Sequence, residues 1–102
     1  MKVYNKLVRD LIPEVIKADG KEYEIEIADK EQREELLEAK LMEEFNEYLE
    51  DKNLEELADV MEVLFGLAHN LGYSEEDLLK KREEKLKNRG GFKEGIVLKW
   101  IY

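Results

Sequence analysis

The sequence predicts a mainly α-helical protein, an antiparallel helical bundle that is completed by homo-oligomerisation. Three long segments with helical apolar periodicity, joined by short turns, fill the chain from residue 30 to residue 89. The chain has 102 residues, 43% of them apolar, so it has room for one thin hydrophobic core. Because small helical domains often complete such a core with a copy of themselves, we expect a single domain, residues 1–102, that forms a homodimer or homotetramer.

The first expected elements are a short helix and a strand. The helix lies in "LIPEVIKADG", where Pro13 fits the first turn and Asp19-Gly20 end it. The segment "KEYEIEIA" that follows alternates charged and apolar residues with the period of a half-buried strand. The C-terminal "GIVLKWIY" is the other β-rich run, so we expect a small two-stranded β ribbon between these two segments.

The three long helices are delimited by capping residues. Asp29 can cap a helix from about Lys30 to Glu50, and Asn53 can cap a second helix that runs to Leu71. Ser74 opens a third helix, rich in Lys and Arg, which ends at "NRGG".

The composition excludes several classes of protein. Acidic residues outnumber basic ones by 26 to 17, which argues against a protein that coats nucleic acid and favours binding of divalent cations. There is no cysteine, so disulfides and thiolate metal sites are excluded. Neither a signal peptide nor the roughly 18 consecutive apolar residues of a membrane span is present. We therefore expect a cytoplasmic protein with no nucleic-acid or membrane partner.

Four acidic residues stand on or beside the apolar faces of two predicted helices. On the first long helix, Glu44 falls within the apolar stripe and Glu47 lies on its border. On the second, Glu56 projects between two apolar side chains and Asp59 flanks it. A buried carboxylate is normally neutralised by a proton, a basic partner or a metal. Residues three apart project side by side, so two such pairs on facing helices could form a cage of oxygens for Mg²⁺ or Mn²⁺.

Structural explanations of the same charges remain open at this point. Glu is the commonest residue in these helices, so the Glu-x-x-Glu spacing arises easily by chance, and Glu56 could be a capping-box side chain of Asn53. On the third helix Lys81, Lys85 and Arg89 recur at four-residue intervals. That basic row could hold phosphate oxygens, or it could complement the helix dipole and pair with neighbouring glutamates.

Three segments together resemble a known family. They are "YNKLVRDLIPEVI", then "EEFNE" followed by "ELADVMEVL", and finally "REEKLKNRGGF". In this order they resemble the MazG-like, phosphoribosyl-ATP-pyrophosphohydrolase-like branch of the all-α nucleoside triphosphate pyrophosphohydrolases, over nearly the whole chain. In that family the pattern Glu-Glu-x-x-Glu, a spacer and Glu-x-x-Asp binds magnesium. Glu43-Glu44-x-x-Glu47 and Glu56-x-x-Asp59 match it, although only eight residues separate Glu47 from Glu56, a shorter spacer than usual.

The resemblance implies a function and a set of site residues. The implied reaction is hydrolysis between the α and β phosphates of a nucleoside triphosphate, which yields a monophosphate and pyrophosphate, for example to remove non-standard nucleotides. Glu44, Glu47, Glu56 and Asp59 are the implied magnesium ligands, with Glu44 or Glu47 as the general base. The implied phosphate contacts are Lys85 and Arg89 first, then Lys6 and Arg9.

Two alternative functions stay open. The first is the phosphoribosyl-ATP pyrophosphohydrolase step of histidine biosynthesis, which uses the same chemistry on a bulkier substrate. The second is a non-catalytic helical oligomerisation or regulatory module, which the short spacer favours.

Overall fold

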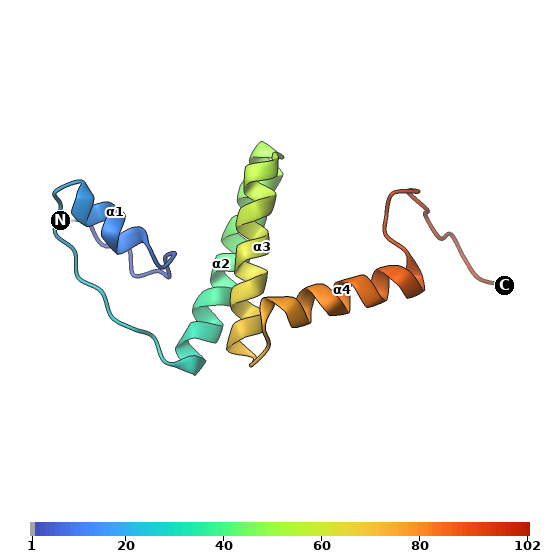
Figure 1. Cartoon of the computed structure of the whole chain (residues 1–102). Helices are drawn as coiled ribbons and strands as arrows, with labels where there is room; N and C mark the ends of the chain where they lie inside the picture. The colour runs from blue at the N-terminus through green and yellow to red at the C-terminus, as the bar shows by residue number, and fades with distance from the viewer. Residues whose placement is uncertain (1) are drawn as a thin grey trace.

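A computed structural model describes residues 2–102. The chain order is α1 (Ile12–Ala18), α2 (Lys30–Asp51), α3 (Leu54–Asn70) and α4 (Glu75–Arg89). Helices α2 and α3 form an antiparallel hairpin, α1 lies on one side of it, and α4 projects away on the other (Figure 1). The predicted mainly helical class is confirmed. The radius of gyration is 17.8 Å, larger than the roughly 13 Å of a compact domain of about 100 residues, so the chain is open in shape.

The predicted capping residues begin the three long helices. The side chains of Asp29, Asn53 and Ser74 each accept a hydrogen bond from the backbone N–H three residues later, at 2.8, 2.9 and 3.1 Å. Asp77 returns a bond to the backbone N–H of Ser74 at 2.9 Å, which completes a capping box. Because these bonds satisfy N–H groups that have no partner inside the helix, they fix where each helix begins.

The turn between α2 and α3 contains only two residues. Lys52 adopts the left-handed conformation, with φ 46° and ψ 53°, and its N–H donates to the carbonyl of Tyr48 at 2.7 Å. Asn53 follows and caps α3. A turn this tight forces the end of α2 and the start of α3 to lie side by side.

The two hairpin helices approach closely at their shared core, which is made of Leu37, Val63 and Ala68. A Cβ atom on Gly66 would lie 2.9 Å from Cδ2 of Leu37, so only a glycine fits there without displacing the leucine. At the open end of the hairpin, Asn70 is buried and donates to the Lys30 carbonyl at 3.1 Å. Arg33 donates to the Asn70 side-chain oxygen at 2.9 Å, so polar contacts lock the end of α3 to the start of α2.

The expected β ribbon is not formed within the described residues. Residues 2–102 contain no strand, and the segments 21–28 and 95–102 run without regular secondary structure. The two segments lie on opposite sides of the α2–α3 hairpin (Figure 1), so they cannot pair with each other. An alternating sequence has strand geometry only when a second strand supplies the hydrogen bonds, and here none does.

Candidate metal centre

The four predicted acidic residues converge near the closed end of the hairpin. One carboxylate oxygen from each of Glu44, Glu47, Glu56 and Asp59 lies within 4.8 Å of the others. Glu44 is only 7% exposed, whereas Glu56 and Asp59 are half-buried. Glu44 and Glu47 come from α2 and the other two from α3, and the two-residue turn places the two pairs opposite each other. The short spacer therefore does not prevent convergence.

Two of the carboxylate oxygens in this cluster are buried without a hydrogen-bond partner. They are Oε2 of Glu44 and Oε2 of Glu56, one from each helix. The other oxygen of Glu44 lies 3.4 Å from Nζ of Lys40. A buried acceptor without a partner is costly, and a second one beside it adds charge repulsion. A hard cation bound by oxygens would satisfy both atoms, so the donor set fits Mg²⁺ or Mn²⁺.

The pKa values of these two glutamates reflect the same crowding. Burial raises the pKa of Glu44 above its ordinary value, the neighbouring Glu47 carboxylate raises it further, and Lys40 opposes the change. Burial also raises the pKa of Glu56, and the negative charges of the surrounding acids, Asp59 first, add to it. Both side chains therefore hold a proton more readily than free glutamate unless a cation replaces it.

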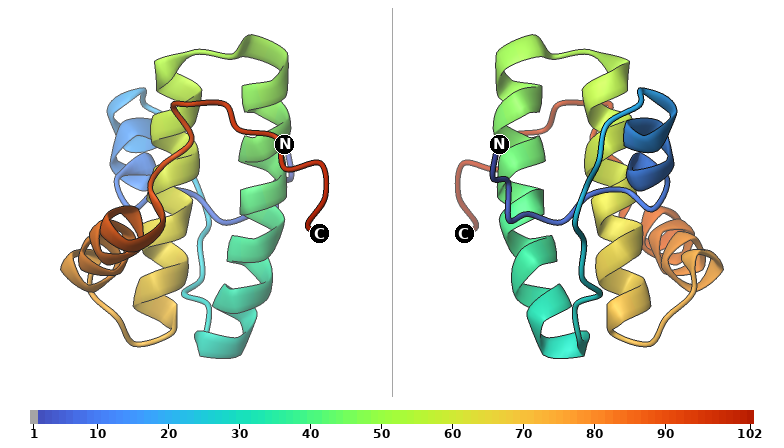
Figure 2. Two further views of the ribbon diagram at one scale, coloured as in Figure 1. Left: turned by 90° about the vertical axis from the view of Figure 1, so that its right-hand side faces the viewer. Right: turned by 90° about the vertical axis from the view of Figure 1, so that its left-hand side faces the viewer.

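Basic side chains from the N-terminal segment reach the acidic cluster. Nη2 of Arg9 lies 2.8 Å from Oδ1 of Asp59. Nζ of Lys6 lies 3.2 Å from Oε1 of Glu43, next to the cluster. Two of the four predicted phosphate-contacting residues therefore stand beside the acids. The N-terminal segment that carries them crosses the hairpin on the same side as α1 (Figure 2).

Lys40 is a member of this site that sequence reasoning missed. Its Nζ lies 3.4 Å from Oε2 of Glu43 and 3.4 Å from Oε1 of Glu44. Burial opposes the ionisation of Glu43, but the hydrogen bonds and charges of Lys6 and Lys40 outweigh it, so its pKa lies below the ordinary value. The signal was present in the sequence, because a lysine four residues before a glutamate on a helix is placed to pair with it.

The structure does not bring Lys85 and Arg89 to the acidic cluster of the same chain. Both lie on α4, which packs only against α3 and projects away from the hairpin (Figure 1). On the same row, Lys81 pairs with Glu84 at 3.2 Å, as expected for surface charges on one helix. Any role of Lys85 and Arg89 in holding phosphate is therefore not supported by the geometry of a single chain.

Comparison with family models, with curated proteins and with solved structures gave no match. Within residues 2–102, every helix is too short or too polar to cross a lipid bilayer.

Proposed function

We propose that this protein is a magnesium-dependent nucleotide pyrophosphohydrolase that cleaves nucleoside triphosphates between the α and β phosphates. The observation that carries the proposal is the cluster of four carboxylates from two facing helices, with two buried oxygens that lack any partner. The sequence resemblance supplies the reaction, and the cluster supplies a site of the right chemistry for it. Mn²⁺ can take the same place, because it accepts the same oxygen ligands.

Each residue of the cluster then has a defined task. Glu44, Glu47, Glu56 and Asp59 would hold the cation. When bound, magnesium neutralises phosphate oxygens and promotes the ionisation of a water molecule. Glu47 or Glu44 accepts the proton of the attacking water, the new P–O bond forms at the α phosphorus, and the bond to the bridging oxygen breaks. Pyrophosphate leaves with the electron pair of that bond.

Arg9 and Lys6 are the side chains of this chain that we assign to the phosphates. Arg9 is held beside the cluster by Asp59, and Lys6 by Glu43. A guanidinium binds two phosphate oxygens in a forked contact, so Arg9 can exchange its carboxylate partner for substrate. Binding of the triphosphate would thus free Asp59 for the cation.

We favour an enzyme over a non-catalytic module. The short spacer between Glu47 and Glu56 suggested the module, but this spacer does not disrupt the site. The short spacer places the two acidic pairs opposite each other instead of separating them. The substrates we propose are non-standard nucleotides, which the enzyme would remove from the nucleotide pool. We also propose that it works as a homodimer or homotetramer, since many large apolar side chains are exposed in the single chain.

The test is metal-dependent turnover on a panel of nucleoside triphosphates, with pyrophosphate, phosphate and monophosphate measured separately. Release of pyrophosphate rather than phosphate identifies attack between the α and β phosphates. Glu44→Gln and Asp59→Asn should each lower turnover by about 100-fold or more, because loss of a supporting residue outside the ligand set already costs about 10–100-fold. Glu50→Gln, an exposed acid on α2, is the matched control and should retain activity. Turnover that needs no metal, or that equals the parent's in both variants, rejects the proposal.

A further inference from the structure

Residues 2–28, which we call the N-terminal arm, are loosely attached to the hairpin. Among the described residues, α1 packs against no other helix, and it has no buried residue. At the base of the arm, Gln32 donates to the Glu26 side chain at 3.5 Å and Arg33 donates to the Ala28 carbonyl at 3.4 Å. The tip of the arm is joined to the hairpin by the ion pairs of Lys6 and Arg9. The arm is therefore tethered at its two ends and is not packed through its helix.

Charge holds the tip of the arm in place. Residues 2–9 contain Lys2, Lys6 and Arg9 and no acidic residue, and the tip lies beside the most acidic part of the hairpin. The side chains of Lys6 and Arg9 are 45% and 56% exposed in their ion pairs. Exposed ion pairs are weak because water and salt screen them. A competing cation can therefore displace the tip.

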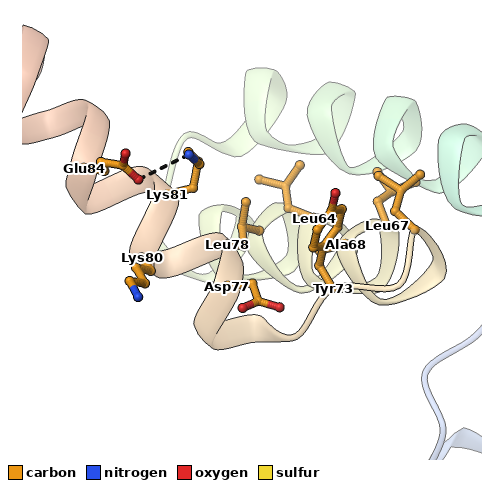
Figure 3. A pocket seen from close by; sticks show the side chains of 10 residues that line it. Leu64, Leu67, Ala68, Tyr73, Asp77, Leu78, Lys80, Lys81 and Glu84 are labelled. Carbon is orange, nitrogen blue, oxygen red and sulfur yellow. Dashed lines mark ion pairs between the residues drawn. The ribbon is translucent and has the colours of Figure 1, made fainter.

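Apolar burial does not decide where the arm lies. The large apolar cavity of the molecule, about 810 Å³, opens at the corner between α3 and α4 (Figure 3). Its lining comes from these two helices and the turn between them, and no residue of the arm contributes to it. Leu11 and Val15 of the arm remain 72% and 54% exposed. The arm thus leaves apolar surface uncovered and places its basic tip at the acids.

Arg9 and a bound cation would use the same carboxylate. Nη2 of Arg9 lies 2.8 Å from Oδ1 of Asp59, and Asp59 is one of the four acids that converge within 4.8 Å. A guanidinium does not lose its proton in a protein, so its repulsion of a nearby metal ion is not relieved by deprotonation. Docking of the tip and binding of the ion therefore oppose each other. By linkage, each lowers the affinity of the other by the same factor.

The docked tip compensates the acidic cluster only in part. Oε2 of Glu44 and Oε2 of Glu56 stay buried without a hydrogen-bond partner although Arg9 is in place. A divalent cation coordinated by oxygens can satisfy atoms that Arg9 does not reach, and it carries twice the charge. The ion therefore has more to gain from the cluster than the tip has.

We propose that the N-terminal arm is an autoinhibitory cover that a divalent cation displaces. In the metal-free protein, Arg9 and Lys6 hold the tip over the acidic cluster. Binding of the ion removes Arg9 from Asp59, and the tip leaves the hairpin. This inference rests on the proposed cation site. It adds regulation to that site, because a phosphate group that takes Arg9 would relieve the competition and tighten the hold on the ion.

The affinity for Mg²⁺ tests the competition. Titration calorimetry of the metal-free protein with magnesium chloride, at constant ionic strength, should show about three- to tenfold tighter binding in Arg9→Gln than in the parent. Lys17→Gln is the matched control, since it removes the same charge from an exposed position on the arm, and its affinity should equal the parent's. Equal or weaker binding in Arg9→Gln overturns the proposal but leaves the cation site standing. Absence of binding in all three proteins overturns both.

A distance measurement tests the movement of the arm. The chain has no cysteine, so spin labels can be attached to Glu14→Cys on α1 and Glu62→Cys on α3, two exposed positions. Dilution with unlabelled protein restricts pulsed electron paramagnetic resonance to distances within one chain. Saturation with Mg²⁺, which is diamagnetic, should lengthen and broaden the distance distribution.

The double variant Lys6→Gln, Arg9→Gln should give the broad distribution without metal. An unchanged distribution in the parent saturated with Mg²⁺, or a narrow one in the metal-free double variant, overturns the proposal. Neither measurement involves turnover, so the proposed reaction can fail while the displacement of the arm stands.

Discussion

The oxygens of Glu44 and Glu56 that lack a partner oppose folding unless a cation is bound. Glu44 is buried between α2 and α3, and only one of its oxygens lies near a basic group. Charge that is buried without full compensation destabilises a protein, whereas a neutral side chain of the same shape is tolerated. Glu44 and Glu56 should therefore lower the stability of the folded protein when no metal is bound and raise it when the ion binds. A purely structural ion pair would not respond to metal in this way.

Glu44→Gln should have opposite effects with and without magnesium. Without metal it removes buried charge, so we expect the free energy of unfolding to rise by about 1 kcal/mol or more. With magnesium the parent should gain melting temperature and the variant should not, since stabilisation follows binding. Calorimetry with EDTA and with excess magnesium measures both effects. Glu50→Gln is the control. If magnesium does not change the melting temperature of the parent, the cluster holds no ion.

Without metal, the difference in the free energy of unfolding between Glu44→Gln and the parent should depend on pH. The pKa of Glu44 is raised in the folded state, above its value in the unfolded chain. Below the unfolded pKa the group is protonated in both states and contributes no difference. As the pH rises from there through the folded pKa, the parent loses stability and the variant does not. Urea unfolding at about pH 5 and about pH 8 should show the larger difference at the higher pH.

At the scale of elements, the sequence is informative wherever a helix end carries its own signal. Asp29, Asn53 and Ser74 were predicted as caps because each side chain can bond to the backbone three residues on, and that contact is local. The strand prediction rested on alternation for residues 21–28 and on β-rich composition for residues 95–102, and a strand of either kind requires a partner elsewhere. A local pattern cannot say which side of the hairpin each segment will occupy, and here the two lie apart.

The acidic cluster was predictable for a similar reason. The spacing of Glu44 with Glu47 and of Glu56 with Asp59 fixes each pair on one helix, and a short turn leaves antiparallel packing as the simple outcome. The position of α4 was not predictable in this way. Its direction depends on the corner after Gly72, so the prediction that Lys85 would lie near the acids had no local support.

The turn between α2 and α3 contains a strained residue that can be improved. Lys52 has φ 46°, a conformation that disfavours any side chain with a Cβ. Lys52→Gly should therefore raise the free energy of unfolding by about 0.5–1 kcal/mol. Urea unfolding measures the gain. Lys52→Ala removes the same charge but keeps the Cβ, so it should bring no comparable gain, and equal gains in both variants would mean that charge rather than backbone strain is responsible.

At the scale of the whole molecule, the exposed area supports the proposed association of chains, which would supply much of the stability of the folded state. A chain that exposes 9807 Å² and buries only three apolar side chains within residues 2–102 has little core of its own. The hairpin is held by its short turn, the close contact at Gly66 and the polar lock at Asn70, and a second copy would supply most of the remaining burial. Such a protein should have a folded monomer of low stability.

The melting temperature should therefore depend on protein concentration. For a dimer that unfolds to two chains, each tenfold rise in concentration stabilises the folded state by about 1.4 kcal/mol, or about 3–5 °C for an assembly of roughly 200 residues. Calorimetry over two decades of concentration, without metal, measures the slope. Leu11→Lys, which alters a residue that is 72% exposed beside α1, should keep this dependence on concentration. The double variant Leu57→Lys, Met61→Lys, which alters exposed apolar residues of α3, should melt at a lower temperature that does not depend on concentration. A melting temperature that stays constant in the parent would mean that the single chain is stable alone, because only association couples unfolding to concentration.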